Sequence, residues 1–171
     1  KDYSYEGVPD IRVIVFRGVP VMAMIRCATH SSDGKANLHQ GAVGVGIDIG
    51  TGQSICAVQH NRIVRQHPDT HVYFDSLSIP HWQQVLELAS GCAGMTGLDY
   101  LGVDIVLDRL RGPMLLELNA RPGLAIQVAN QAGLQHRLEL AAKIADDFDK
   151  ADQKIAAARR YFTSVTAQNI L

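Results

Sequence analysis

The fold of this chain is decided by the stretch Gly102-Val103-Asp104-Ile105-Val106-Leu107-Asp108, which is followed after a short break by Leu115-Leu116-Glu117-Leu118-Asn119-Ala120-Arg121-Pro122-Gly123. The apolar residues are typical of two strands, but carboxylates and an amide stand where the apolar pattern would otherwise continue. Strand side chains alternate between the two faces of a sheet. Glu117 and Asn119 therefore share one face, and Leu116 and Leu118 share the other.

The two strands are expected to form a hairpin. If Leu107 pairs with Met114 across residues 108–113, Asp104 lies opposite Glu117. The oxygen-bearing side chains of Asp104, Glu117 and Asn119 would then converge. The buried face would consist of Val103, Ile105, Leu107, Leu116 and Leu118.

Two carboxylates and an amide oxygen, with no Cys and no nearby His, suit a hard cation such as Mg²⁺. Mg²⁺ takes one or two carboxylates and completes its shell with water and phosphate oxygens, so a nucleoside triphosphate is implied. The alternative is that Asp104 and Glu117 are solvated on a partly exposed sheet face. The metal site is favoured because Asn119 is a poor strand former and an Arg121-Pro122-Gly123 turn follows it.

These residues resemble the end of an ATP-grasp domain and, within that superfamily, the RimK-like alpha-L-glutamate ligases that modify a ribosomal protein. Three upstream segments are similar to those ligases in order and spacing, namely residues 10–18, 23–26 and 36–41. The resemblance covers roughly residues 9–134, and its motifs are specific jointly rather than singly. It implies an α+β fold: an ATP-grasp C-terminal lobe over residues 1–134, with a largely antiparallel sheet flanked by helices, followed by a helical extension over residues 135–171.

The resemblance also implies an activity, that of an ATP-dependent carboxylate-amine ligase acting through an acyl phosphate. Asp104 and Glu117 would hold one Mg²⁺, and Glu117 and Asn119 a second, with Mn²⁺ as a possible substitute. The implied substrates are small-molecule or peptide carboxylates and amines. Gly123 falls where these ligases bring a backbone amide close to the reacting carbonyl, as an oxyanion donor.

Arg12 and Arg26 lie on two predicted strands, residues 11–16 and 20–28, joined by an Arg17-Gly18 turn. Their guanidinium groups would bind phosphates or a substrate carboxylate. The alternative is a pair of surface arginines at a sheet edge, and only the family resemblance favours the site. Asn37 is ordinarily a turn residue, yet its position matches a polar residue that faces the nucleotide phosphates in the family.

Arg121 departs from the family pattern, because the glutamate ligases of this type commonly carry a small residue such as Ser there. A cation beside the metal site would recognise the acyl phosphate or an acidic substrate group. Alternatively, Arg121 pairs with Asp108 or Glu117. The identity of the acceptor therefore does not transfer from the glutamate ligases.

The lysines and the Gly-rich lid of the first ATP-grasp lobe are not visible in the sequence. We therefore expect the chain to be the second lobe of a longer protein, inactive on its own. The alternative function is a nucleotide-binding regulatory or scaffold protein that keeps the metal hairpin without the chemistry. Such a protein would act through the long C-terminal helix expected over residues 138–162, which could also mediate a homo-oligomer.

Length, composition and charge indicate a single domain and argue against a nucleic-acid-binding or membrane-spanning protein. A chain of 171 residues with 47% apolar content is about one domain with a real core. Its net charge of −1 gives no attraction to nucleic acid or anionic membranes, and no apolar run is long enough to cross a bilayer. Cys27, Cys56 and Cys92 are expected to be free thiols of a cytoplasmic protein.

The remaining elements are predicted from local patterns. Gly44, Gly46 and Gly50 are spaced one residue too far apart for a dinucleotide fingerprint, and the alternation of Val45, Ile47 and Ile49 predicts a strand there instead of a helix start. Helices are predicted from about residue 79 to 96 and from 125 to 132. Four histidines, His60, His67, His71 and His81, are expected on loops or the surface.

Overall fold

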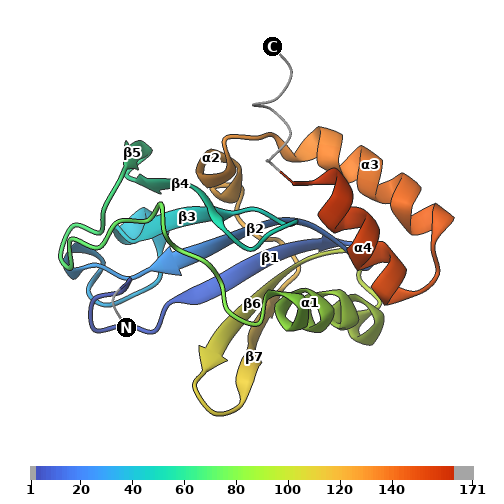
Figure 1. Cartoon of the computed structure of the whole chain (residues 1–171), viewed down its shortest axis with the longest axis horizontal. Coiled ribbons are helices and arrows are strands. Elements are labelled where there is room, and N and C mark those ends of the chain that lie inside the picture. Colours follow the sequence, from blue (N-terminus) through green and yellow to red (C-terminus); the bar gives the residue numbers. More distant parts are fainter. Residues whose placement is uncertain (1–2, 164–171) are drawn as a thin grey trace.

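The computed structural model describes residues 3–163. Seven strands form one antiparallel sheet in the order β5-β4-β3-β2-β1-β6-β7, and the helices lie around it (Figure 1). The predicted α+β fold is therefore confirmed. The strands are β1 (Asp10–Phe16), β2 (Val19–Cys27), β3 (Val43–Ile47), β4 (Ser54–Gln59), β5 (Arg62–Val64), β6 (Tyr100–Asp108) and β7 (Gly112–Asn119), and the helices are α1 (Trp82–Thr96), α2 (Ile126–Asn130), α3 (Leu134–Asp147) and α4 (Ala151–Tyr161), with short 3-10 turns at His30–Ser32 and Leu38–Gln40.

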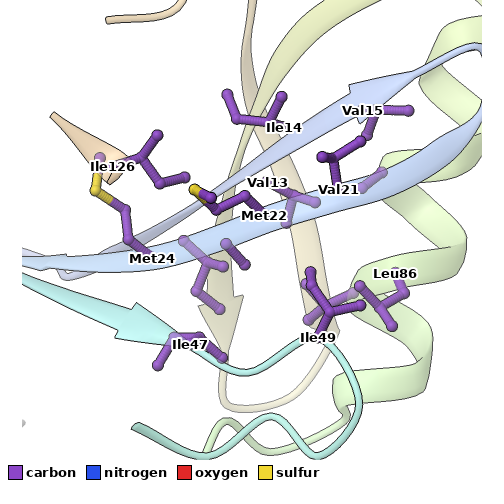
Figure 2. Close-up of a cluster of buried hydrophobic side chains, with 14 of the residues drawn as sticks. Val13, Ile14, Val15, Val21, Met22, Met24, Ile47, Ile49, Leu86 and Ile126 are labelled. Carbon is purple, nitrogen blue, oxygen red and sulfur yellow. The ribbon is translucent and has the colours of Figure 1, made fainter. Parts of the chain in front are cut away.

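The core lies on both faces of the central strands. Met22 and Met24 of β2 face Ile126 of α2, whereas Ile49 lies on the other side with Leu86 of α1 (Figure 2). Each of these side chains is at least 98% buried, and such burial stabilises the fold by about 1.5–3 kcal/mol per side chain. The central hairpin is thus held from above and below.

The β6–β7 hairpin confirms one pairing and corrects another. Asp104 lies opposite Glu117 as predicted, but Leu107 pairs with Pro113 and not with Met114. A β-bulge follows Asp104 and shifts the register by one residue. Because a one-residue shift moves a side chain to the opposite face, Leu116 is 59% exposed and not buried as expected. Val103 and Ile105 are fully buried, and Leu107 and Leu118 are half-buried.

The helices agree with the predicted positions except near the C-terminus. α1 and α2 fall within the predicted ranges, but the continuous helix expected over residues 138–162 is divided into α3 and α4. Phe148 ends α3 in an extended conformation, and its half-buried side chain packs against the core. Burying this aromatic ring stabilises the fold, which explains why the helix ends here although the helical spacing of apolar residues continues.

The turn between β1 and β2 is held by three helices. The hydroxyl of Ser90 in α1 donates to the carbonyl of Gly18 at 2.5 Å, and the ammonium of Lys154 in α4 donates to the carbonyl of Arg17 at 3.1 Å. Arg17 also forms an ion pair with Asp146 of α3 at 2.8 Å. The far end of the central hairpin is therefore fixed.

Two further expectations have clear outcomes. Residues 43–47 form a strand, and a Cβ on Gly46 would collide with the backbone of Ala129, so this glycine serves the packing of α2.

His67 is fully buried, contrary to the surface position expected for it. Its Nε2 lies 2.9 Å from the carbonyl of Ala28, and its Nδ1 accepts the backbone amides of Asp69 and Thr70.

The three cysteines form no disulfide. Within residues 3–163, no helix has the length and apolar character needed to span a membrane.

Candidate active site

Four charged side chains form a network on one face of the neighbouring strands β2, β1 and β6. The strand register places Asp10 beside Arg26 and Arg12 beside Asp104. Arg12 donates from Nε and Nη2 to the two oxygens of Asp104 at 2.8 and 2.6 Å. Arg26 donates to the two oxygens of Asp10 at 2.6 and 2.5 Å, and its Nη2 also reaches Asp104 at 2.8 Å. We call these four residues the arginine–aspartate tetrad.

Three members of the tetrad are buried and the side chain of Arg26 is 14% exposed, so the surface alternative for the two arginines is wrong. Asp104 is 1% exposed, Asp10 5% and Arg12 9%. An unpaired charge at such depth is costly, and removing one partner of a buried pair typically destabilises a fold by about 3–5 kcal/mol. The two bidentate pairs explain how the interior tolerates four charges, whose formal sum is zero.

The electrostatics of the tetrad follow from burial and pairing. Burial works against the charged form of Arg26, but the hydrogen bonds that Arg26 donates to Asp10 and the negative charges of Asp10 and Asp104 outweigh this effect and raise the pKa of Arg26. Burial likewise raises the pKa of Asp10 against the opposing hydrogen bonds of Arg26. Next to this pair, burial and the charge of Asp10 raise the pKa of the Cys27 thiol to about 12.

A small cavity of about 60 Å³ lies beside the two arginines. Four of the predicted site residues, Arg12, Arg26, Asn37 and Gly123, line it together. They come from β1, β2, the loop after β2 and the loop after β7, so the fold gathers side chains that are far apart in sequence. The other lining residues are Met24, Leu38, His39 and Ala125.

Two of the residues that line the cavity, Asn37 and Gly123, differ in whether they have a structural role. The side chain of Asn37 accepts the backbone amide of His39 at 3.0 Å and caps the following 3-10 turn, so its turn role is confirmed. Gly123 is exposed, and a Cβ added there would meet nothing within 4 Å. Packing within residues 3–163 therefore gives no reason for a glycine at this position.

The three predicted metal ligands are unequally available. The Glu117 carboxylate is exposed and has no hydrogen-bond or ion-pair partner in the described part of the chain. The Asn119 side-chain oxygen accepts the amide of Arg121 at 2.9 Å. Both oxygens of Asp104 are engaged by arginines, so three free oxygen ligands do not converge. Within residues 3–163, no group of three or more His, Cys, Asp or Glu gathers as a metal site.

The fit to Mg²⁺ is therefore partial. Glu117 and Asn119 offer a carboxylate and an amide oxygen at the sheet edge, and Asp104 lies across from Glu117 in the register. Asp104 would have to exchange a guanidinium for the ion. Arg121 is exposed, and in the described structure it forms no ion pair with Asp108 or Glu117, so its role stays a prediction.

Asp10 is the member of the tetrad that sequence reasoning missed. Counting outward from the two-residue turn Arg17-Gly18 pairs Phe16 with Val19 and would place Asp10 opposite Ile25. A register shift between Ile14 and Val15 moves Asp10 opposite Arg26 instead. The sequence feature that could have indicated Asp10 was a lone acidic residue at the start of an apolar strand. Its pairing with Arg26 depends on a β-bulge, which local sequence patterns do not reveal.

Comparison with known proteins places the chain among ATP-grasp proteins. Residues 1–143 match the family model of sugar-transfer associated ATP-grasp proteins. Among solved structures, the ATP-grasp ligase PsnB complexed with a minimal precursor is 17% identical, with a TM-score of 0.43, over 90% of this chain and 35% of that one. PsnB complexed with the precursor peptide PsnA2 and AMPPNP is 16% identical, with a TM-score of 0.42, over 90% of this chain and 33% of that one.

The chain spans about a third of the length of these solved proteins. A comparison with curated proteins finds no match. The predicted superfamily is confirmed, whereas the glutamate-ligase subtype stays a prediction.

Proposed function

Because this chain belongs to the family of sugar-transfer associated ATP-grasp proteins, we propose that it is the C-terminal lobe of an ATP-dependent carboxylate-amine ligase. The observation that carries the proposal is the cavity in which Arg12, Arg26, Asn37 and the open backbone of Gly123 meet beside Asp104. Two guanidinium groups and a free amide are the donors that a phosphorylated carboxylate requires. On this proposal the lobe covers residues 1–134, and the helical region from 135 onward is an extension.

The tetrad supports this role because its arginines are held ready without a ligand. Arg26 donates hydrogen bonds to both Asp10 and Asp104. A phosphate or substrate carboxylate can therefore take the place of one aspartate while the other stays paired with the guanidinium. Arg12 and Asn37 would contact the nucleotide, and Arg26 and Gly123 the reacting carboxylate. Arg121 would approach the same group from the exposed loop.

Glu117, Asn119 and, after exchange, Asp104 are the residues that would hold Mg²⁺, and we propose two ions, as the family resemblance implies. When bound, such ions would neutralise charge on the phosphates of ATP. The donor chemistry supports this assignment, since carboxylate and amide oxygens are the ligands that Mg²⁺ prefers.

The amine and the carboxylate remain open. The family description associates its members with sugar transfer, so sugar acids and amino sugars belong in the substrate panel together with amino acids and peptides. A specific observation favours a second function. Because both oxygens of Asp104 are occupied by arginines, the chain could bind nucleotide as a regulatory or scaffold protein without the chemistry.

The experiment that tests the proposal measures ADP release by the full-length protein with a panel of carboxylates. Hydroxylamine is added to trap an acyl phosphate as its hydroxamate. We expect carboxylate-dependent ADP release and a hydroxamate of the same acid. Tight ATP binding without ADP release under any acceptor would refute the ligase and favour the regulatory protein.

A further inference from the structure

A second, larger pocket adjoins the cavity of the arginines. Its volume is about 310 Å³, and it shares Leu38, His39 and Ala125 with the smaller cavity. Small-molecule sites typically begin at about this size. We call it the His60 pocket, and it is lined by Leu38, His39, Ala42, Val58, His60, Asn61, Ala125 and Val128.

One wall of the His60 pocket is a tight turn. His60 and Asn61 connect β4 to β5, and both have positive φ angles of 49° and 60°. Two consecutive left-handed residues are typical of a type I′ hairpin turn, whose geometry leaves little freedom. The imidazole packs over Gly41, where a Cβ would lie only 3.2 Å from the ring. The carbonyl of Gly41 in turn accepts the side chains of Thr29 and Gln59 at 2.9 and 2.8 Å.

The chemistry of the lining is specific. His39, His60 and Asn61 have side chains that make no hydrogen bond to any other described residue, so their donors and acceptors are available to a ligand. The remaining lining residues are apolar, and no Asp, Glu, Lys or Arg lines the pocket. A cationic group would therefore find no counter-charge there, whereas hydroxyl or amide groups would find partners.

We propose that the His60 pocket binds the body of the carboxylate substrate, and that this body carries hydroxyl or amide groups and no positive charge. The inference rests on the proposed function, because the shared residues Leu38, His39 and Ala125 lead from the pocket to Arg12 and Arg26. The carboxylate end would lie at the arginines and the hydroxylated end against His60 and Asn61. A sugar acid has this chemistry.

The test uses three probe acids with the full-length protein: D-glucuronate with a hydroxylated body, hexanoate with an apolar body and 6-aminohexanoate with a cationic body. Binding is measured by equilibrium dialysis with Mg²⁺ and a non-hydrolysable ATP analogue, and ADP release is measured in parallel. We expect D-glucuronate to bind at least about tenfold more tightly than 6-aminohexanoate.

Variants locate the binding. His60→Ala and Val128→Phe should weaken D-glucuronate binding at least about tenfold and leave ATP binding unchanged. His60→Asn should keep the fold if His60→Ala does not, because Asn tolerates positive φ. His136→Ala removes an exposed histidine on α3 and serves as the control.

The outcomes separate the two proposals. D-glucuronate binding that depends on His60, without ADP release for any acid, would refute the ligase and keep the pocket assignment. ADP release with acids whose binding is unaffected by Val128→Phe and by folded His60→Ala would refute the pocket assignment and keep the ligase. Equal binding of all three acids, or no binding of any, also overturns the assignment.

Discussion

The two halves of the candidate site differ in what organises them. On β1, β2 and β6, the arginine–aspartate tetrad is buried and every charge has a partner. On β7 and the loop after it, Glu117, Arg121 and Gly123 are exposed, and Glu117 has no partner among residues 3–163. In the first half the charged groups are paired with one another within the fold. In the second half the exposed groups contribute little to holding the fold together.

This difference indicates how the two halves respond to change. A buried paired charge contributes to stability because its removal strands its partner. An exposed group with no partner contributes little to stability, so an effect of its removal on activity reports on ligands. Substitutions in the two halves should therefore separate stability from activity.

The largest effect on stability is expected for Asp104→Ala. It removes the carboxylate that accepts three hydrogen bonds from Arg12 and Arg26, and should lower the free energy of unfolding by about 3–5 kcal/mol. Urea denaturation measures this loss. The double variant R12M/D104L should recover most of it, because it removes both charges of the pair. Equal stability of all three proteins would mean that the tetrad is not buried in solution.

Glu117→Gln should show the opposite behaviour. We expect ADP release to fall by about 100-fold or more, which corresponds to about 2.7 kcal/mol, while the free energy of unfolding changes by less than about 0.5 kcal/mol. The matched control is Glu139→Gln on α3, also an exposed glutamate. If Glu117→Gln lost fold and activity together, the metal role of this residue would be contradicted.

Two glycines sharpen the comparison further. Gly46→Ala places a methyl group against the backbone of Ala129 and should destabilise the fold by about 1–3 kcal/mol. Gly123→Ala meets open space and should leave stability within about 0.5 kcal/mol, yet reduce ADP release because the proposed role of Gly123 needs a close approach of the substrate to its backbone amide. Thermal denaturation and activity assays on both variants measure the contrast. A destabilised Gly123→Ala protein would remove the distinction.

The remaining effect is on the pH dependence of stability. The Cys27 thiol has a pKa of about 12 in the folded chain against 9.0 for the free group, so only the unfolded chain ionises it as pH rises above 9. Its contribution to stability is complete below pH 9 and is lost progressively as pH rises toward 12, by at most about 1.4 kcal/mol per pH unit. Urea denaturation at pH 8, 9 and 10 should therefore show a steeper decline for wild type than for Cys27→Ala. Burial also raises the pKa of the partly exposed Cys56 thiol, so Cys56→Ala should change the slope in the same direction but less than Cys27→Ala does.

Local patterns were sufficient for most elements of the fold. The alternation around Asp104 and Glu117 predicted that these residues face each other, and they do. The helical spacing from about residue 79 to 96 predicted α1. These features depend on neighbours in sequence or across one tight hairpin, where side-chain period and turn chemistry dominate.

What could not be predicted depends on contacts between distant elements. The bulge after Asp104 exposed Leu116, and the packing of Phe148 ended α3. His67 is buried because its ring hydrogen-bonds to the carbonyl of Ala28, just after β2 and 39 residues away in sequence. The resemblance selected four residues that line one cavity. It did not predict the ion pairs of Arg12 and Arg26, which follow from the register of three strands.

The turn at Arg17 and Gly18 has a consequence for how the protein is made. Its carbonyls accept hydrogen bonds from side chains 72 and 137 positions further along the chain. During translation the β1–β2 hairpin can therefore form early, but its tip stays exposed to water until α4 has left the ribosome. The far end of the two strands that carry Arg12 and Arg26 therefore gains its last hydrogen bond only after nearly all of the described residues have been synthesised.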